Sequence, residues 1–440
     1  MKALLAALML SVCMGAVCWA SPESMTIESQ TLPNGLRVVL APDRSAPAVH
    51  VAVWYRSGSR DDRSGHTGLA ALVERLSWRA AAGATDLGVR EQAVGGTPTS
   101  ATTPDYTCFQ AVLPPEQLEV GLAAEAERMT ALRASEADFK ADKAQVIEQQ
   151  RNRSAQPLTS ALDRLFELAF VRHPYRQPLY GGEDDLGMAT LEECRAYHAS
   201  RYAPSNAVLT VTGSFTPARA LTIIQKRFGA IPKRAAASRV AVAEPVQDAE
   251  RRAQVKSASP AALLLVGWPA PADSSRDAAA VELLTQLLAG GRNARLNPSA
   301  DSSRSVLQLQ GAFDSRREPS LITLTAVVKP EGDKGAAERQ VVEAAERASS
   351  QPPSADELER CKNQLETAFL LNWQSVQNRG QWIGQGAVRF GDPRAATKRL
   401  QRVRAATPED VRRAAERYLK SDRRNVVWVV PETANAGGGE

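Results

Sequence analysis

The sequence predicts an α+β fold made of two related halves. Short segments of alternating apolar and polar residues, bounded by Gly, Pro and Asn, indicate β-strands. Longer segments with a 3.6-residue apolar period and Ser or Thr at their start indicate helices. A helix followed by a strand closes each half of the chain, and this recurrence indicates an internal repeat.

The first half opens with strands. The stretch from Thr31 to Gly68 contains one strand, a turn at Asn34-Gly35, a second strand and a longer alternating strand that ends near Gly58. An Asn-Gly pair between two alternating segments is a strong hairpin signal. Three β-strands are therefore expected before the first helix.

The closing elements of the two halves correspond to each other. One predicted helix starts at Thr190 and leads into a strand at residues 206–211; the other starts at Thr407 and leads into a strand at residues 425–430. In both helices the Thr is followed by acidic residues, which suits an N-cap and the positive end of a helix dipole. The same order at both ends predicts homologous halves.

The second half mixes strands and helices in the same way. A strand is predicted at residues 261–268 and helices at residues 277–288 and 354–373. Ser354 and Glu357 form a capping-box pattern at the start of the last helix.

The length of 440 residues also favours at least two domains. Residues 232–252 have no helical or strand period and are predicted to be a linker. The predicted domains are residues 21–231 and 253–433, followed by a disordered tail at residues 434–440.

Residues 1–20 have the pattern of a secretory signal peptide. Lys2 is followed by an apolar run to Ala20, with small residues at its end. Cleavage near Ala20 predicts a mature chain secreted across the inner membrane, in the periplasm or outside the cell. An uncleaved anchor is the alternative, because a run of this length can just span a bilayer.

The composition argues against a disulfide-stapled protein and against a protein that binds nucleic acids or nucleotides. Two of the five Cys lie in the signal peptide, and the other three are too few and too widely spaced for a disulfide framework. Cys108 lies in an apolar strand and is predicted to be a core residue. The net charge of +5 is mild for this length, and we find no basic patch with interleaved aromatics and no phosphate-binding loop.

The helix at residues 69–76 carries the main functional signal. One side is an apolar stripe of Leu69, Leu72, Val73 and Leu76. The other side, expected to face a cleft or solvent, carries Ala71, Glu74, Arg75 and Trp78. Side chains four positions apart point the same way, so positions 71 and 75 could share one ligand. Ala71 has no donor atom, and Arg75 has no lone pair to offer a cation.

This helix and its surroundings resemble the pitrilysin/insulinase family of metallopeptidases. The order Gly-Leu-Ala-x-x-x-Glu at residues 68–74 resembles the family's signature helix, and matching segments include VGG at 94–96, TSATTPDYT at 99–107 and YAPSN at 202–206. Active members carry H-x-x-E-H there, with two zinc-binding His and a Glu as general base. The resemblance places Ala71 and Arg75 at the two ligand positions and Glu74 at the base position.

The family's third zinc ligand is a Glu on a later helix. The matching position is Gln149, although a shift of one residue would make Glu148 the counterpart. A neutral amide is a poor zinc ligand. The remaining His residues, which are His50, His66, His173 and His198, have no ligand-like spacing and are predicted to be surface or hydrogen-bonded residues. Arg75 is expected to pair with Glu74 or Glu148, because an unpaired buried guanidinium is costly.

The resemblance implies a clamshell of two halves, each an antiparallel sheet covered by helices, around a chamber. It implies extended peptides bound by strand addition along the edge strand at Thr99, Ser100, Ala101 and Thr102. It also implies a zinc-bearing homologous peptidase as partner in a heterodimer, with no cofactor on this chain. Two other hypotheses stay open: a non-proteolytic scaffold or peptide-binding protein, and an enzyme that uses Glu74 and Glu148 as a carboxylate pair.

In some family pairs the metal-free subunit holds peptide through an Arg-Tyr pair in its second half. Arg295 and Leu296 match the start of that segment. The Arg position of the pair falls on Asp301 and the Tyr position on Gln308, with Arg304 nearby. The resemblance therefore implies that this pair is also lost.

Overall fold

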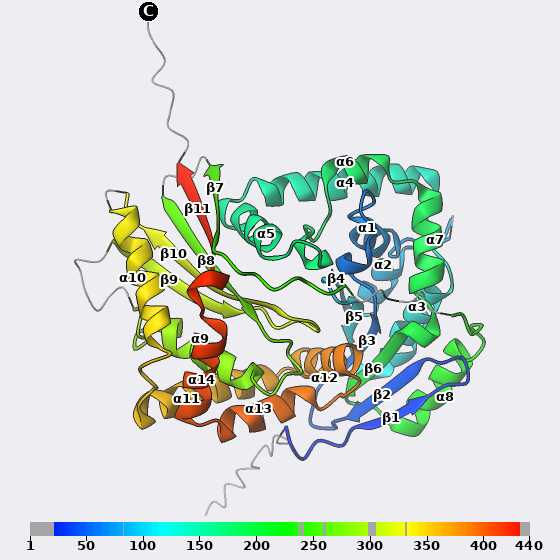
Figure 1. Cartoon of the computed structure of the whole chain (residues 1–440). Coiled ribbons are helices and arrows are strands. Elements are labelled where there is room, and N and C mark those ends of the chain that lie inside the picture. The colour runs from blue at the N-terminus through cyan, green and yellow to red at the C-terminus, as the bar shows by residue number, and fades with distance from the viewer. Residues whose placement is uncertain are drawn as a thin grey trace, which may run out of the picture.

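The computed structural model describes residues 22–81, 83–235, 239, 242–257, 261–297, 305–330 and 332–431. The predicted signal peptide, the predicted tail, Asp301 and Arg304 lie outside the described residues. Figure 1 shows two sheets, one from each half of the chain, each flanked by helices. The α+β prediction is confirmed.

The first half contributes a six-stranded sheet. Its strands are β1 (Glu28–Thr31), β2 (Arg37–Pro42), β3 (Val49–Tyr55), β4 (Thr97–Thr102), β5 (Thr107–Leu113) and β6 (Ala207–Gly213). Its α-helices are α1 (Leu69–Leu76), α2 (Leu87–Gln92), α3 (Leu118–Thr130), α4 (Glu136–Ser154), α5 (Pro157–Ala169), α6 (Glu183–Met188), α7 (Leu191–Arg201) and α8 (Pro217–Phe228).

The second half contributes a five-stranded sheet. Its strands are β7 (Arg251–Ser257), β8 (Ala262–Ala270), β9 (Val306–Phe313), β10 (Ser320–Val328) and β11 (Asn425–Pro431). Its α-helices are α9 (Ala278–Ala289), α10 (Lys334–Arg347), α11 (Ala355–Trp373), α12 (Val376–Phe390), α13 (Ala395–Ala405) and α14 (Pro408–Tyr418). β7 overlaps the last two residues, 251 and 252, of the predicted linker.

The strand orders show that the two halves are repeats of one topology. The first sheet runs β1-β2-β6-β3-β5-β4, and the second runs β7-β11-β8-β10-β9. Removing β1 makes the orders identical, with β4 and β9 as the corresponding edge strands. Each sheet is antiparallel except for one parallel pair, β2 with β6 and β7 with β11.

The predicted helix caps are present. Thr190, Ser354 and Thr407 each accept a hydrogen bond from the third residue of their helix, and each is part of a capping box. The turn at Asn34-Gly35 joins β1 to β2, and Gly35 has φ of +92°, a conformation that favours glycine. These caps and this turn depend only on residues close together in the sequence, so they could be predicted from it.

The two halves exchange a helix. α5, from the first half, packs on β7, β8 and β11 of the second sheet, while α12, from the second half, packs on β3 and β6 of the first sheet. Ala161 and Leu165 of α5 share an apolar core with Leu265 and Val427. Neither half therefore completes its core alone, although each also has its own large cluster.

The His and Cys predictions can be compared directly with the structure. Each His has a polar partner: His50 with Gln110, His66 with Glu193, His173 with Glu318 and His198 with the carbonyl of Arg128. Cys108, Cys194 and Cys361 are buried and free, and Cys108 lies in the core as predicted. No helix within the described residues is long and apolar enough to cross a membrane.

Candidate functional site

The candidate site is built on α1. Asp62 holds the start of this helix by accepting hydrogen bonds from the backbone N–H of Gly68 (2.8 Å) and Ala70 (3.1 Å). A buried carboxylate at this end satisfies amides that lack partners within the helix. Leu69, Leu72, Val73 and Leu76 enter the first-half core, which confirms the predicted apolar stripe.

The opposite side of α1 is less open than the sequence suggested. Ala71 is only 3% exposed, and Trp78 is partly buried against the ring of Phe109. α4 and α7 both pack on α1, and α4 lies beside Arg75 through Asp142. The expectation of a helix side facing a cleft or solvent was therefore wrong for Ala71, whereas Glu74, Arg75 and Trp78 are partly exposed.

Glu74 is tied to the edge strand β4. The hydroxyl of Thr102 donates a 2.5 Å hydrogen bond to Glu74 Oε2. Burial raises the pKa of Glu74, and hydrogen bonds from Ser100 and Thr102 act in the opposite direction. Glu74 therefore keeps the position of a base beside the edge strand, with one carboxylate oxygen already occupied.

Arg75 pairs with neither expected partner. Its Nε lies 3.2 Å from Oδ1 of Asp142 on α4, a carboxylate that is 1% exposed. The pairing predicted with Glu74 or Glu148 was wrong. Asp142 lies in α4, about two helical turns before Gln149. Its side chain, and not that of Glu148, faces the side of α1 that carries Arg75.

Arg79 shares the same carboxylate and was missed by the sequence analysis. Its guanidinium donates to both oxygens of Asp142, each at 2.9 Å, and to Asp86 at 3.0 Å. Arg79 lies three residues after the end of α1, so helix periodicity does not place it, and the two arginines meet only at the carboxylate of α4. The available signal was Asp142, a charged residue at helical spacing from the apolar Phe139 and Val146.

Gln149 and Glu148 point in different directions. The side-chain amide of Gln149 donates to the hydroxyl of Tyr180 at 3.1 Å. Tyr180 lies within electrostatic reach of Glu74, whose charge contributes to raising the pKa of the phenol after burial, the larger cause. Glu148 is exposed and accepts from Asn152. The structure therefore brings Gln149, and not Glu148, toward the α1 site, and the proposed Glu74–Glu148 pair is not formed.

The edge strand β4 alternates as a peptide-binding strand should. Thr99 and Ala101 are exposed, whereas Ser100 and Thr102 turn toward α1. Ser100 accepts a 2.9 Å hydrogen bond from the indole N–H of Trp78. Among the strands that the structure describes, β4 pairs only with β5, so no described strand is hydrogen-bonded to its other edge.

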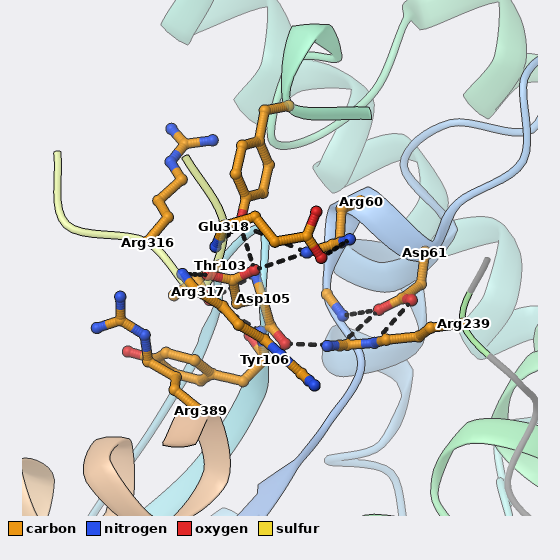
Figure 2. A network of polar contacts seen from close by, with 12 residues as sticks. Arg60, Asp61, Thr103, Asp105, Tyr106, Arg239, Arg316, Arg317, Glu318 and Arg389 are labelled. Atoms are coloured by element: carbon orange, nitrogen blue, oxygen red, sulfur yellow. Dashed lines mark hydrogen bonds and ion pairs between the residues drawn. The ribbon is translucent and has the colours of Figure 1, made fainter. Parts of the chain in front are cut away.

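The halves meet beyond the end of β4, at a contact that we call the seam. The seam joins the β9–β10 loop, residues 314–319, to the β4–β5 turn (Figure 2). Glu318 accepts from Arg60 Nη2 at 2.6 Å and lies 2.7 Å from Nε2 of His173. The backbone N–H of Arg317 donates to Asp105 at 2.8 Å.

A cavity of about 430 Å³ lies between the halves next to the seam. Leu162 and Phe166 of α5 give it an apolar wall, and Thr323 and Thr325 of β10 face them. Pro104, just after β4, lines the same cavity. A chain lying along β4 would therefore lead into this space.

Comparison with known proteins decides the family. A model described as insulinase (peptidase family M16) matches residues 37–183, and one described as peptidase M16 inactive domain matches residues 189–365. The chain belongs to the M16 peptidase family. The resemblance to the pitrilysin/insulinase family is confirmed, and α1 lies within the first of the two matched regions.

Relatives and solved structures agree over nearly the whole chain. The zinc protease PqqE of Helicobacter pylori is 26% identical over 432 residues, covering 96% of this chain and 97% of that protein. The crystal structure of a protease from Helicobacter pylori has a TM-score of 0.88 at 25% identity, covering 92% of this chain and all of that one. A structure described as peptidase M16 inactive domain, from Pseudomonas fluorescens, has a TM-score of 0.84 at 18% identity, covering 93% and 98%; this likeness concerns the fold alone.

The name of the PqqE relative implies zinc, and the residues around α1 do not fit that ion. Ala71 offers a methyl group, Arg75 a cation already paired with Asp142, and Gln149 an amide bound to Tyr180. Among the residues that the structure describes, no group of three or more His, Cys, Asp or Glu side chains is placed to hold a metal ion. Zinc needs three such protein ligands even in its open catalytic sites.

Proposed function

We propose that this chain is a zinc-free M16 homologue that binds extended peptides and serves as the non-catalytic subunit of a heterodimeric zinc endopeptidase. One observation carries the proposal: a guanidinium stands at position 75, where active members have a zinc-binding His, and it is paired with a buried carboxylate. A fixed positive charge there repels a divalent cation. Bond cleavage would then belong to a zinc-bearing partner.

The state of Glu74 supports the same proposal. A general base needs a free carboxylate oxygen within reach of a polarised water. Glu74 accepts a short hydrogen bond from Thr102 on one of its two oxygens, and the proposal places no zinc beside it to polarise a water. This contact suits a residue that joins α1 to the edge strand.

Peptide binding is proposed for β4. Strand addition uses backbone hydrogen bonds along an unpaired edge, with alternate side chains contacting the peptide. β4 has such an edge, and Thr99 and Ala101 are the exposed side chains on it. The adjoining cavity would take peptide side chains beyond Pro104. Secretion through the predicted signal peptide completes the proposal and would place the heterodimer in the periplasm or outside the cell.

The first test is an affinity purification of the tagged mature chain from its native envelope fraction, read by mass spectrometry. Recovery of an H-x-x-E-H homologue in near-equal amount supports the heterodimer. Recovery of the chain alone, or only with unrelated proteins, contradicts it and favours the scaffold or peptide-binding alternative with the same fold.

The second test measures metal content and activity of the purified chain. We expect the purified chain to bind less than one equivalent of zinc. We also expect it to have no peptidase activity that depends on Glu74, as tested with Glu74→Gln. The matched comparison is the triple variant Ala71→His, Arg75→His, Gln149→Glu, which restores a ligand set and should raise zinc binding. Stoichiometric zinc in the unmodified chain, with activity abolished by Glu74→Gln, would refute the zinc-free assignment.

A further inference from the structure

Four arginines from distant parts of the chain gather beside the seam. Arg37 lies in β2, Arg56 directly follows β3, Arg239 lies in the linker, and Arg317 is in the β9–β10 loop of the second half. All four are partly buried. We refer to them as the arginine cluster.

The first sheet positions Arg37 and Arg56 on the same face. Val208 of β6 is paired with Arg37 of the neighbouring strand β2 and with Trp54 of the other neighbour, β3. Arg56 follows Trp54 by two residues, so both project from the sheet side that α12 covers. The guanidinium of Arg37 donates to the carbonyl of Gly391 at the end of α12, at 2.8 Å.

The β4–β5 turn brings in the other two arginines. Asp105 accepts from the backbone N–H of Arg317 through its carboxylate, and its carbonyl accepts from Arg239 Nη2 at 2.7 Å. Arg239 also pairs with Asp61 at 2.9 Å, and Asp61 in turn accepts from the N–H of Gly58, two residues after Arg56. Figure 2 shows the guanidinium groups of Arg239 and Arg317 turned toward the same space.

The carboxylates nearby do not balance this charge. Asp61 is shared by Arg239 and Arg201, and Asp105 accepts from Tyr175 and Arg60. Asp392, which lies near Arg37, pairs with Lys398. Residues 232–243 of the linker contain no acid.

Arg56 and Arg317 are the uncompensated members. Within the described part of the chain, neither side chain makes a hydrogen bond or ion pair. Burial lowers the pKa of Arg56, and the charges of Arg37, Arg317 and Arg239 lower it further. Several like charges held together in a partly desolvated place destabilise the folded chain unless an anion joins them.

We propose that Arg37, Arg56, Arg239 and Arg317 form a binding site for one anion with carboxylate or phosphate oxygens, which links the two halves across the seam. Guanidinium groups match the geometry of both oxyanions and bind them in a bidentate manner. Two sources supply this chemistry: free phosphate, and the carboxylate end of a peptide held in the chamber. Only the second source rests on the proposed peptide-binding function.

The test titrates the full mature chain with inorganic phosphate at constant ionic strength, with chloride as the replaced anion. Isothermal calorimetry and thermal unfolding should both show saturable binding and a rise in Tm. Arg56→Gln and Arg317→Gln should each weaken binding at least tenfold. The control is Arg347→Gln, an exposed arginine of α10 that pairs with Glu343 and should bind as the unmodified chain does.

Folding of the variants is checked in chloride alone. Removing an uncompensated charge should leave Tm unchanged or higher, so a large drop in both variants would contradict the repulsion on which the site rests. A non-saturable response, equal in the unmodified chain and both variants, would overturn the site. Loss of binding in Arg56→Gln but not in Arg317→Gln would overturn the link between halves.

A second arm distinguishes the sources. A short peptide with a free C-terminus is compared with the same peptide amidated, each with and without phosphate. If the acid binds at least tenfold more tightly than the amide and phosphate displaces it, the peptide carboxylate is the ligand. If acid and amide bind equally and phosphate binding persists, the site takes the free anion, and the proposed peptide role of β4 is unaffected.

Discussion

The two halves share one strand order and exchange one helix, yet they accommodate the exchanged helix in opposite ways. In the first sheet the large side chains His50 and Trp54 project from β3, and α12 passes over them with Gly380 and Gly384. In the second sheet the small residue is on the strand: Gly267 of β8 lies under Leu165 of α5. The same topology therefore allows either the strand or the helix packed on it to carry the large residues, provided that the total side-chain volume is kept.

The largest effect is expected from a methyl group on α12. A Cβ at position 384 would lie 2.1 Å from the indole of Trp54, which is 2% exposed and hydrogen-bonded to Thr210. We expect Gly384→Ala to lower the free energy of unfolding by about 3 kcal/mol or more, measured by urea denaturation. In an unobstructed helix the same change stabilises by about 1 kcal/mol, so the sign is diagnostic.

Two matched variants sharpen this comparison. A Cβ at Gly267 would meet flexible carbons of Leu165 at 3.0–3.2 Å, and Gly267→Ala should cost below about 1 kcal/mol. Gly187→Ala in α6, with no neighbour within 4 Å, should be neutral or stabilising. If Gly384→Ala behaves like Gly187→Ala, the close packing of α12 on Trp54 is refuted.

This exchange marks the limit of what the sequence could predict. Capped helices, the Asn34-Gly35 turn and the repeat were predictable because each depends on nearby residues. The destinations of α5 and α12 were not, because an apolar stripe does not say which sheet will cover it. The α1 residues could be aligned with a family motif. Asp142 could not be identified as the partner of Arg75 without knowing how α1 and α4 pack against each other.

The halves also differ in buried titratable groups, and this difference gives a second test. All four His belong to the first half. His50 is fully buried between Gln110 and Gly380, and burial lowers its pKa to about 4. As pH falls below 6.5 the unfolded chain takes up this proton before the folded chain does. His50 therefore stabilises the fold above pH 6.5, and that stability is lost progressively as pH falls toward 4.

The contribution of His50 should amount to about 2 kcal/mol between pH 7 and pH 5. His50→Gln should reduce the pH dependence of the free energy of unfolding by this amount, as measured by denaturation at each pH. The unmodified chain, denatured at the same pH values, is the comparison. An unchanged pH slope in His50→Gln would show that His50 is protonated without cost in the folded chain.

The smallest expected effect concerns the helix pair that carries the candidate site. α1 and α4 are joined by Arg75, Arg79 and Asp142, whereas the corresponding α9 and α11 are joined by an amide hydrogen bond between Gln286 and Gln364. Arg79→Ala removes two hydrogen bonds from a buried carboxylate and should cost about 1–2 kcal/mol. Arg75→Ala removes one longer contact from a side chain that is 40% exposed, and should cost below about 0.5 kcal/mol.

Gln364→Ala, which removes an exposed hydrogen bond in the second half, is the matched control and should also cost below about 0.5 kcal/mol. Denaturation of the three variants under one condition gives the order directly. If Arg75→Ala costs as much as Arg79→Ala, Arg75 is needed to hold α1 against α4, and its presence at position 75 has a structural explanation. If it costs as little as Gln364→Ala, stability does not require an arginine there, because Arg79 already neutralises Asp142. The main physical consequence of Arg75 is then the positive charge that it places where a cation would bind.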